Sequence, residues 1–253
     1  MSDNEPLTPG KVSRAWNSRP VFIGAAIVIA IAVLVVAAAT ITALTSPKGG
    51  GATGTKPAAS STSRPDTAGG CSVPAGSMST TPAVPKDLAW KTGADGISWP
   101  TSKLFGPTKT ESGFDACFAH SPLGAAFAAV TATYSQYDPK HTVQQALGFY
   151  IADSEGKAAN IAGTAKSFNP AQLRSSGINP AGFIVDAYTA NQAQVTLVDS
   201  VTSSATGYVG IPCTMVWHDG DWKLSVLDDG ELSSGNPTTP SASDFVAWGG
   251  DNQ

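Results

Sequence analysis

An uninterrupted apolar run near the N-terminus constrains this chain more than any other feature. The 19 residues from Val21 to Ala39 are all apolar, alanine or glycine, and the charge-free span extends further on both sides. A helix needs about 20 such residues to cross a bilayer core of about 30 Å. We therefore expect a single transmembrane helix from Val21 to Leu44. A cleaved signal peptide is the alternative, because small residues near 37–39 would suit cleavage, although its apolar core is usually only about 7–15 residues long.

The place of this helix in the chain predicts its orientation. The tail of residues 1–20 is short and carries Lys11, Arg14 and Arg19, whereas everything that can fold comes after the helix. Cytoplasmic flanks of membrane helices are enriched in positive charge. We expect a cytoplasmic N-terminus, a location in the cell membrane and a domain outside the cytoplasm. Residues 45–85 are rich in glycine, serine, threonine and proline, and such a composition predicts a disordered linker.

The remaining residues, 86–253, are expected to form one domain, and their charge differs from that of the rest of the chain. They hold 9 Lys and Arg against 16 Asp and Glu, which gives −7. The first 85 residues hold 6 basic and 3 acidic residues, so the +3 there brings the whole chain to −4. An acidic domain is unsuited to direct binding of nucleic acid or anionic lipid, and we expect neither as its partner.

Helix signals dominate the first half of this domain. Ser121 suits an N-cap with Pro122 at the first helical position, and apolar residues then recur at helical spacing as far as Tyr134. A second helix is expected to follow, ending near residue 151. A weaker helical stretch covers 156–176.

From Gly182 onward the hydrophobic period changes to two, which is typical of strands. The strand candidates are 183–190, 193–202, 207–217 and 222–227. Asp219-Gly220 predicts a hairpin turn between the last two, and Trp90 and Trp99 flank an earlier turn. The order of elements predicts an α+β fold, with helices packed across a curved antiparallel sheet.

The pattern is similar to the nuclear-transport-factor/ketosteroid-isomerase-like cone fold. The resemblance rests on the helix pair at 121–151 and on the closing hairpin VWHDGDWKLSVL at Val216–Leu227. It implies a cone-shaped domain. Enzymes of that fold place an acid or base inside the cavity, and Asp186, Tyr134 and Tyr188 would be the candidates here. No nucleophile elbow is present, and we expect no catalytic residues.

The layout of tail, membrane helix, linker and domain also resembles the bitopic inner-membrane component of type IV secretion and conjugation channels. Gly106-Pro107 and CFAHSPLGAAFAAV (Cys117–Val130) resemble an uncharacterised actinobacterial family associated with conjugative elements. Actinobacterial membrane proteins associated with lipid-import (Mce) systems share the same layout, and they are the close alternative. These resemblances imply function by analogy of fold and layout.

Three cysteines outside the cytoplasm predict a disulfide. Cys71 has no packing reason to be cysteine in a polar linker, and Cys117 comes just before the first helix of the domain. Cys213 falls on the apolar face of a strand, where a buried free thiol is common. We favour Cys71–Cys117, with Cys117–Cys213 and a fully reduced chain as alternatives.

No metal or cofactor is expected. None of the three histidines, His120, His141 and His218, has metal-ligand spacing to another histidine or cysteine. The five carboxylates between 219 and 231 lack the spacing of a calcium loop. They are better explained as a solvated acidic turn, which could also be a patch for a basic partner.

Together these observations predict a membrane-anchored, non-enzymatic assembly component of an envelope-spanning complex for conjugation or type IV secretion. Its expected partners are other membrane or envelope proteins, with a homo-oligomer as an open alternative. An accessory role in an Mce lipid-import system is the second hypothesis. A cone-fold small-molecule-binding or isomerase-like protein is the third.

Overall fold

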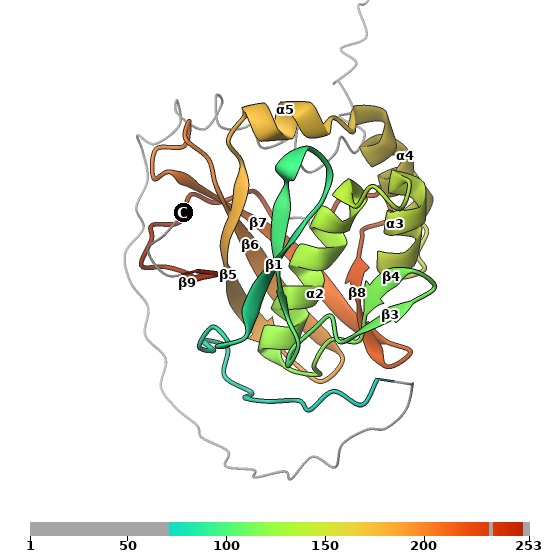
Figure 1. Ribbon diagram of the computed structural model, residues 1–253, viewed down its shortest axis with the longest axis vertical. Coiled ribbons are helices and arrows are strands. Elements are labelled where there is room, and N and C mark those ends of the chain that lie inside the picture. The colour runs from blue at the N-terminus through green and yellow to red at the C-terminus, as the bar shows by residue number, and fades with distance from the viewer. Residues whose placement is uncertain (1–70, 233–234, 250–253) are drawn as a thin grey trace, which may run out of the picture.

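A computed structural model of the chain describes residues 71–232 and 235–249 (Figure 1). The proposed tail at 1–20, the membrane segment Val21–Leu44 and the first part of the proposed linker lie outside these residues. No helix within the described ranges is long and apolar enough to cross a membrane. The described ranges contain nine strands in three sheets and four α-helices.

Two small antiparallel hairpins precede the first helix. In the first, β1 (Leu88–Thr92) pairs with β2 (Ser98–Ser102), and the short 3-10 turn η1 (Ala94–Gly96) joins them. The second consists of β3 (Lys109–Glu111) and β4 (Phe114–Ala116). The hairpin expected around Trp90 and Trp99 is therefore present, with Lys91 rather than Trp90 opposite Trp99.

The second half of the domain forms one five-stranded antiparallel sheet. Its strands are β5 (Asn179–Tyr188), β6 (Gln192–Ser200), β7 (Tyr208–His218), β8 (Asp221–Ser225) and β9 (Val246–Ala247), in the order β8-β7-β6-β5-β9. The expected turn between β7 and β8 is confirmed. Both Asp219 (φ 53°) and Gly220 (φ 81°) have the positive φ that this tight hairpin turn requires.

Helix α2 (Pro122–Tyr134) is the centre of the domain. Its expected N-cap is confirmed, because the Ser121 hydroxyl accepts a hydrogen bond from the Gly124 N–H. All thirteen of its residues are buried, since it lies between the five-stranded sheet and the β1–β2 hairpin (Figure 1). A Cβ on Gly124 would come within 1.9 Å of the Ala119 carbonyl oxygen, so only glycine permits this approach.

The other helices keep largely to one side of α2. A 3-10 turn, η2 (Ser135–Tyr137), leads to α3 (Val143–Tyr150), which packs against α4 (Lys157–Ser167). Helix α5 (Pro170–Ser175) packs against η1.

The expected fold class is therefore wrong. We expected an α+β, nuclear-transport-factor-like domain with its helices packed across a curved sheet. The described chain is instead sheet-rich, with a five-stranded sheet, two extra hairpins and four short helices. The error has a physical cause: α2 is apolar on all sides and needs cover on all sides. The β1–β2 hairpin covers the part of α2 that the five-stranded sheet leaves uncovered.

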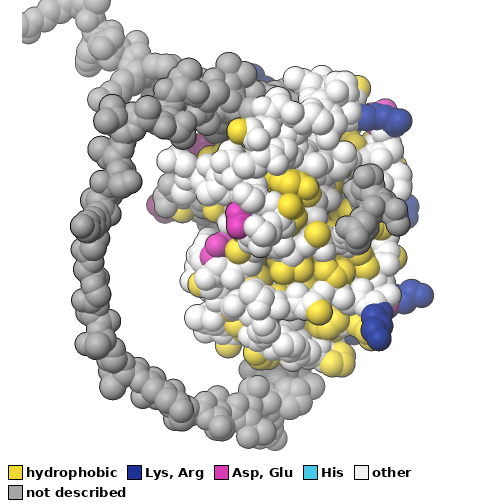
Figure 2. All heavy atoms as spheres, turned by 90° about the vertical axis from the view of Figure 1, so that its left-hand side faces the viewer, with side chains coloured by type: hydrophobic (Ala, Val, Ile, Leu, Met, Phe, Trp, Pro, Cys, Tyr) yellow, Lys and Arg dark blue, Asp and Glu magenta, His cyan; other side chains and the backbone are white. Residues whose placement is uncertain are grey.

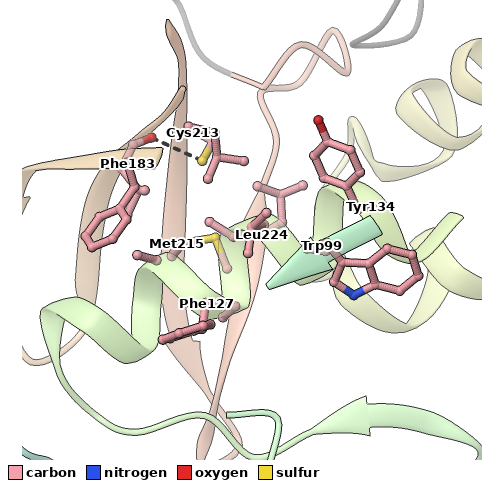
Figure 3. Packing of buried hydrophobic residues seen from close by; sticks show 14 of the residues in the cluster. Trp99, Phe127, Tyr134, Phe183, Cys213, Met215 and Leu224 are labelled. Carbon is pink, nitrogen blue, oxygen red and sulfur yellow. Dashed lines mark hydrogen bonds between the residues drawn. The ribbon is translucent and has the colours of Figure 1, made fainter. Parts of the chain in front are cut away.

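The core lies between α2 and the sheet (Figure 3). Phe127 of α2 packs with residues such as Met215 and Leu224, all almost fully buried. Cys213 is a buried free thiol, as one reading of the sequence allowed, and donates a hydrogen bond to the Val195 carbonyl. Trp248, just after β9, is also part of this core. Its ring centroid lies 4.9 Å from that of Phe127 and 4.4 Å from that of Phe183, within the range of favourable aromatic pairs.

Candidate functional site

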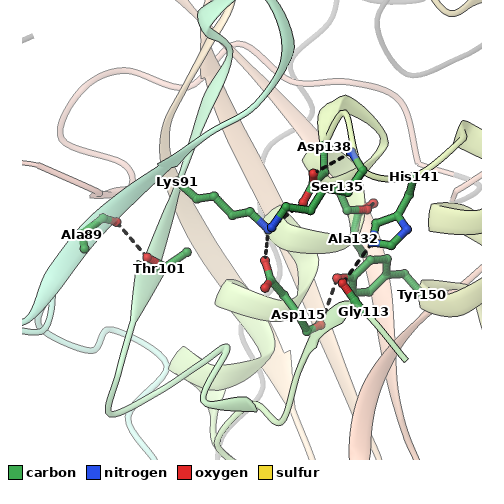
Figure 4. A network of polar contacts seen from close by, with 11 residues as sticks. Ala89, Lys91, Thr101, Gly113, Asp115, Ala132, Ser135, Asp138, His141 and Tyr150 are labelled. Carbon is green, nitrogen blue, oxygen red and sulfur yellow. Dashed lines mark hydrogen bonds and ion pairs between the residues drawn. The ribbon is translucent and has the colours of Figure 1, made fainter. Parts of the chain in front are cut away.

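Lys91 joins three separate segments of the chain through two ion pairs (Figure 4). Its Nζ lies 2.6 Å from a carboxylate oxygen of Asp115, on β4, and 2.8 Å from one of Asp138, which follows η2. The same Nζ lies 5.5 Å from the centroid of the Trp99 ring, within cation–π range. The Tyr150 hydroxyl donates to the backbone carbonyl of Asp115 and so attaches α3 to this cluster.

Partial burial makes these ion pairs stronger than surface pairs. Burial alone would lower the pKa of Lys91, but hydrogen bonds and charge from the two carboxylates outweigh it and raise that pKa. At Asp138 burial would raise the pKa, and the contacts with Lys91 and Lys140 outweigh it and lower it. Each shift favours the charged form of its group at neutral pH.

A pocket of about 350 Å³ opens beside this cluster. That volume lies in the range of small-ligand sites. Three segments form its wall: η1, the stretch from η2 into α3, and the end of α4 with the residue that follows it. Its lining residues are Ala94, Gln136, Tyr137, Asp138, Pro139, His141, Thr142, Val143, Gln144, Ala165 and Phe168.

Local contacts hold the pocket wall in place. The ring of Tyr137 stacks on Phe168 with centroids 5.3 Å apart, and the ring of His141 stacks on Phe114 at 4.0 Å. Thr142 and Gln145 form a capping box at the start of α3, with reciprocal hydrogen bonds of 2.9 and 3.2 Å. Such a box satisfies two free backbone N–H groups, so this rim of the pocket is preorganised.

A second polar pair lies inside the core, away from the ion pairs. The Tyr134 hydroxyl donates a 2.8 Å hydrogen bond to Asp199 of β6, and both residues are only 3% exposed. No cationic side chain among the described residues pairs with Asp199. Burial raises the pKa of Asp199 to about 7, although the Tyr134 hydrogen bond lowers it. Burial and the nearby Asp199 charge also raise the pKa values of Tyr134 and Tyr137.

A fourth carboxylate, Asp221, holds the segment that leads into α2. Asp221 accepts hydrogen bonds from the backbone N–H groups of Cys117 (2.8 Å), Phe118 (2.9 Å) and Trp222 (2.9 Å). It is buried, so the expectation that the acidic residues of 219–231 form a solvated turn is wrong for this one. Burial raises its pKa, and the three N–H groups oppose that shift.

The disulfide bond involves Cys117, one of the residues that Asp221 binds. Cys71 and Cys117 are bonded, with their Cα atoms 5.2 Å apart. This is the pairing favoured from the sequence. It ties Cys71, which the sequence analysis assigned to the linker, to the segment that leads into α2.

One family model matches residues 52–247, which is more than half of the chain. The chain belongs to the DUF8175 family. The family is described as a domain of unknown function. The DUF8175 match includes Cys71, both hairpins, all four helices and the whole five-stranded sheet. No curated protein and no solved structure matches the chain.

The DUF8175 domain does not bring together the three side chains that a cone-fold enzyme would use. Tyr134 contacts Asp199, whereas Asp186 is exposed and accepts a hydrogen bond from Thr196. A bulge in β5 between residues 185 and 187 breaks the alternation that placed Asp186 and Tyr188 on one face. The Tyr188 ring lies edge-on to Trp222 instead.

The histidines have structural contacts in the DUF8175 domain. The ring of His120 stacks on Trp217 at 3.9 Å and hydrogen-bonds the Ala190 carbonyl. His141 bonds the Gly113 carbonyl, and His218 lies against Asp219. The described residues include no group of three or more His, Cys, Asp or Glu side chains that could hold a metal.

Sequence reasoning missed Asp199 and the pocket. A signal for Asp199 was present, because Val195, Leu197 and Asp199 alternate along one strand and should share a buried face. The pocket left no such signal, since its wall combines segments from residue 94 to residue 168.

Proposed function

We propose that this chain is a membrane-anchored, non-enzymatic assembly component of an envelope-spanning complex, with its domain outside the cytoplasm. Conjugation or type IV secretion is the process that we propose for that complex. Segment 21–44 is the proposed anchor, and other membrane or envelope proteins are the proposed partners.

An apolar band on one side of the domain carries the proposal. Hydrophobic side chains gather on the side of β5 and β9, with acidic side chains beside them and basic side chains at the edge of this face (Figure 2). The β1–β2 hairpin packs against β5. Half-buried apolar residues of these elements include Leu88, Trp90 and Val246. Contiguous apolar surface that remains outside the core is typical of protein-binding sites.

The disulfide supports the proposed location. Disulfides persist in oxidising compartments and are rare in the cytoplasm of most cells. The bond from Cys71 to Cys117 lies on the C-terminal side of segment 21–44, which agrees with a domain outside the cytoplasm.

Site-specific photocrosslinking in the native cell tests the proposal. A photoreactive amino acid at Val246, which is half-buried on the apolar band, should give a discrete adduct with another envelope protein. The same amino acid at Glu155, which is exposed between α3 and α4, is the matched control and should give none.

The identity of the adduct decides between the hypotheses. A protein encoded beside a conjugation ATPase would support the proposed process, and a lipid-import protein would support the Mce alternative. If Val246 and Glu155 give the same products, the band is not a binding surface and the proposal fails.

A further inference from the structure

The pocket beside Asp138 contains a buried polar group without a protein partner. Gln136 is 4% exposed, and its side-chain N–H donates to the Thr133 carbonyl at 2.8 Å. Within the described ranges, its Oε1 accepts no hydrogen bond, and this atom is not completely enclosed by protein. Since Gln136 lines the pocket, we infer that the accessible side of Oε1 faces it. A buried amide oxygen of this kind requires a donor from water or from a ligand.

His141 and Asp138 add further acceptor atoms to the pocket lining. The Nε2 atom of His141 lies 2.9 Å from the Gly113 carbonyl oxygen and must therefore carry the proton. In the tautomer with its proton on Nε2, the Nδ1 atom can accept a hydrogen bond. Asp138 adds a carboxylate, whereas no Lys or Arg is among the lining residues. From outside the lining, the Lys91 ammonium pairs with one carboxylate oxygen of Asp138, and the backbone N–H of Lys140 donates to the other.

The apolar part of the lining suits an aliphatic chain. Val143, Ala165 and Phe168 line the pocket, and Phe168 is held by its stacking on Tyr137. A ligand that matches both parts has an apolar stem and a head rich in N–H donors. Arginine has this form, because its guanidinium group offers five N–H donors and no acceptor on a three-carbon stem.

We propose that this pocket binds an arginine side chain of a partner protein. The stem lies against Val143, Ala165 and Phe168, and the guanidinium group donates to Gln136 and Asp138. The inference rests on the proposed function, since it assigns a specific contact to the partner of the assembly. The net acidic charge of the domain favours a basic segment in that partner.

Titration of the full-length chain in lipid nanodiscs tests the pocket directly. The probe is Nα-acetyl-arginine-N-methylamide, and the matched control is the citrulline compound, which has nearly the same shape but no charge. The arginine probe should bind at least about tenfold more tightly, which is the effect of one charge-assisted hydrogen bond. Equal affinity for the two compounds would overturn the proposal.

Two variants locate the binding. Gln136→Met removes the acceptor at similar volume and should weaken binding of the arginine probe about tenfold. Ala165→Trp should abolish binding by filling the pocket, whereas Ala162→Trp, at an exposed position of the same helix, should leave it unchanged. Unchanged binding in Ala165→Trp would place the site elsewhere and overturn the assignment.

Free L-arginine distinguishes a partner side chain from a free amino acid. Tighter binding of free arginine than of the blocked probe would overturn the assignment to a partner. This experiment and the crosslinking experiment can fail separately. Binding of the blocked probe without an adduct at Val246 would retain the arginine pocket and remove the apolar band as the docking surface.

Discussion

The buried carboxyl of Asp199 should make the stability of the domain depend on pH. Its folded-state pKa is about 7, against 3.8 for an ordinary aspartate. The folded chain therefore holds this proton more tightly than the unfolded chain. The resulting stabilisation is complete below about pH 4 and is lost as the pH rises through about 7. A pKa difference of one corresponds to about 1.4 kcal/mol, so the loss at this site amounts to about 4 kcal/mol.

Asp199→Asn removes the ionisation and keeps an acceptor for the Tyr134 hydroxyl. Urea unfolding at a series of pH values between about 5 and 9 gives the free energy of unfolding of each protein. The free energy of unfolding of the variant, relative to that of the wild type, should rise by about 3 kcal/mol over this pH range, because the first part of the loss occurs below pH 5. Other ionising groups affect both proteins alike and cancel in the difference.

Tyr134→Phe provides the companion measurement. The Tyr134 hydroxyl lowers the pKa of Asp199, so its removal should raise that pKa. The pH-dependent loss of stability should then occur at higher pH than in the wild type. A difference between Asp199→Asn and wild type that stays constant with pH would refute the reasoning, because Asp199 would then ionise alike in the folded and unfolded chains.

Three further substitutions or treatments test the framework around the site by urea or thermal unfolding. Asp221→Asn should cost about 3 kcal/mol because it weakens three N–H contacts to a buried carboxylate; Asp219→Asn, at the exposed turn of the same hairpin, should change stability by less than about 0.5 kcal/mol. Reduction of Cys71–Cys117, which spans 46 residues, should cost about 4 kcal/mol, and a reductant should have no effect on a Cys71→Ser variant. Trp248→Ala should cost about 3–5 kcal/mol through the cavity that it leaves, and an equal loss on substitution of the exposed Ser243 by alanine would contradict that explanation.

Features set by neighbouring residues could be predicted from the sequence. The cap at Ser121 and the turn at Asp219-Gly220 depend on a few adjacent side chains, and both form as expected. The fold class depended on what covers α2. That cover comes from the β1–β2 hairpin, and nothing within the helix sequence identifies the element that packs against it.

The candidate site was predictable only in part. Asp199 follows the alternation of its strand, whereas Asp186 and Tyr188 depart from theirs because a bulge intervenes. The ion pair of Lys91 with Asp138 joins segments that are far apart in the chain, and the same holds for the wall of the pocket. Such contacts are products of tertiary packing, and one sequence carries no local signal for them.

The position of Trp248 has a consequence for synthesis of the protein. A ribosome releases α2 and β5 well before residue 248, so Phe127 and Phe183 lack one of their ring contacts until nearly the whole domain has emerged. A growing chain that also has to cross a membrane would expose this surface throughout its passage. Chaperones that recognise unfolded apolar segments should therefore engage the nascent chain until Trp248 emerges, and premature termination just before Trp248 should yield a product marked for proteolysis.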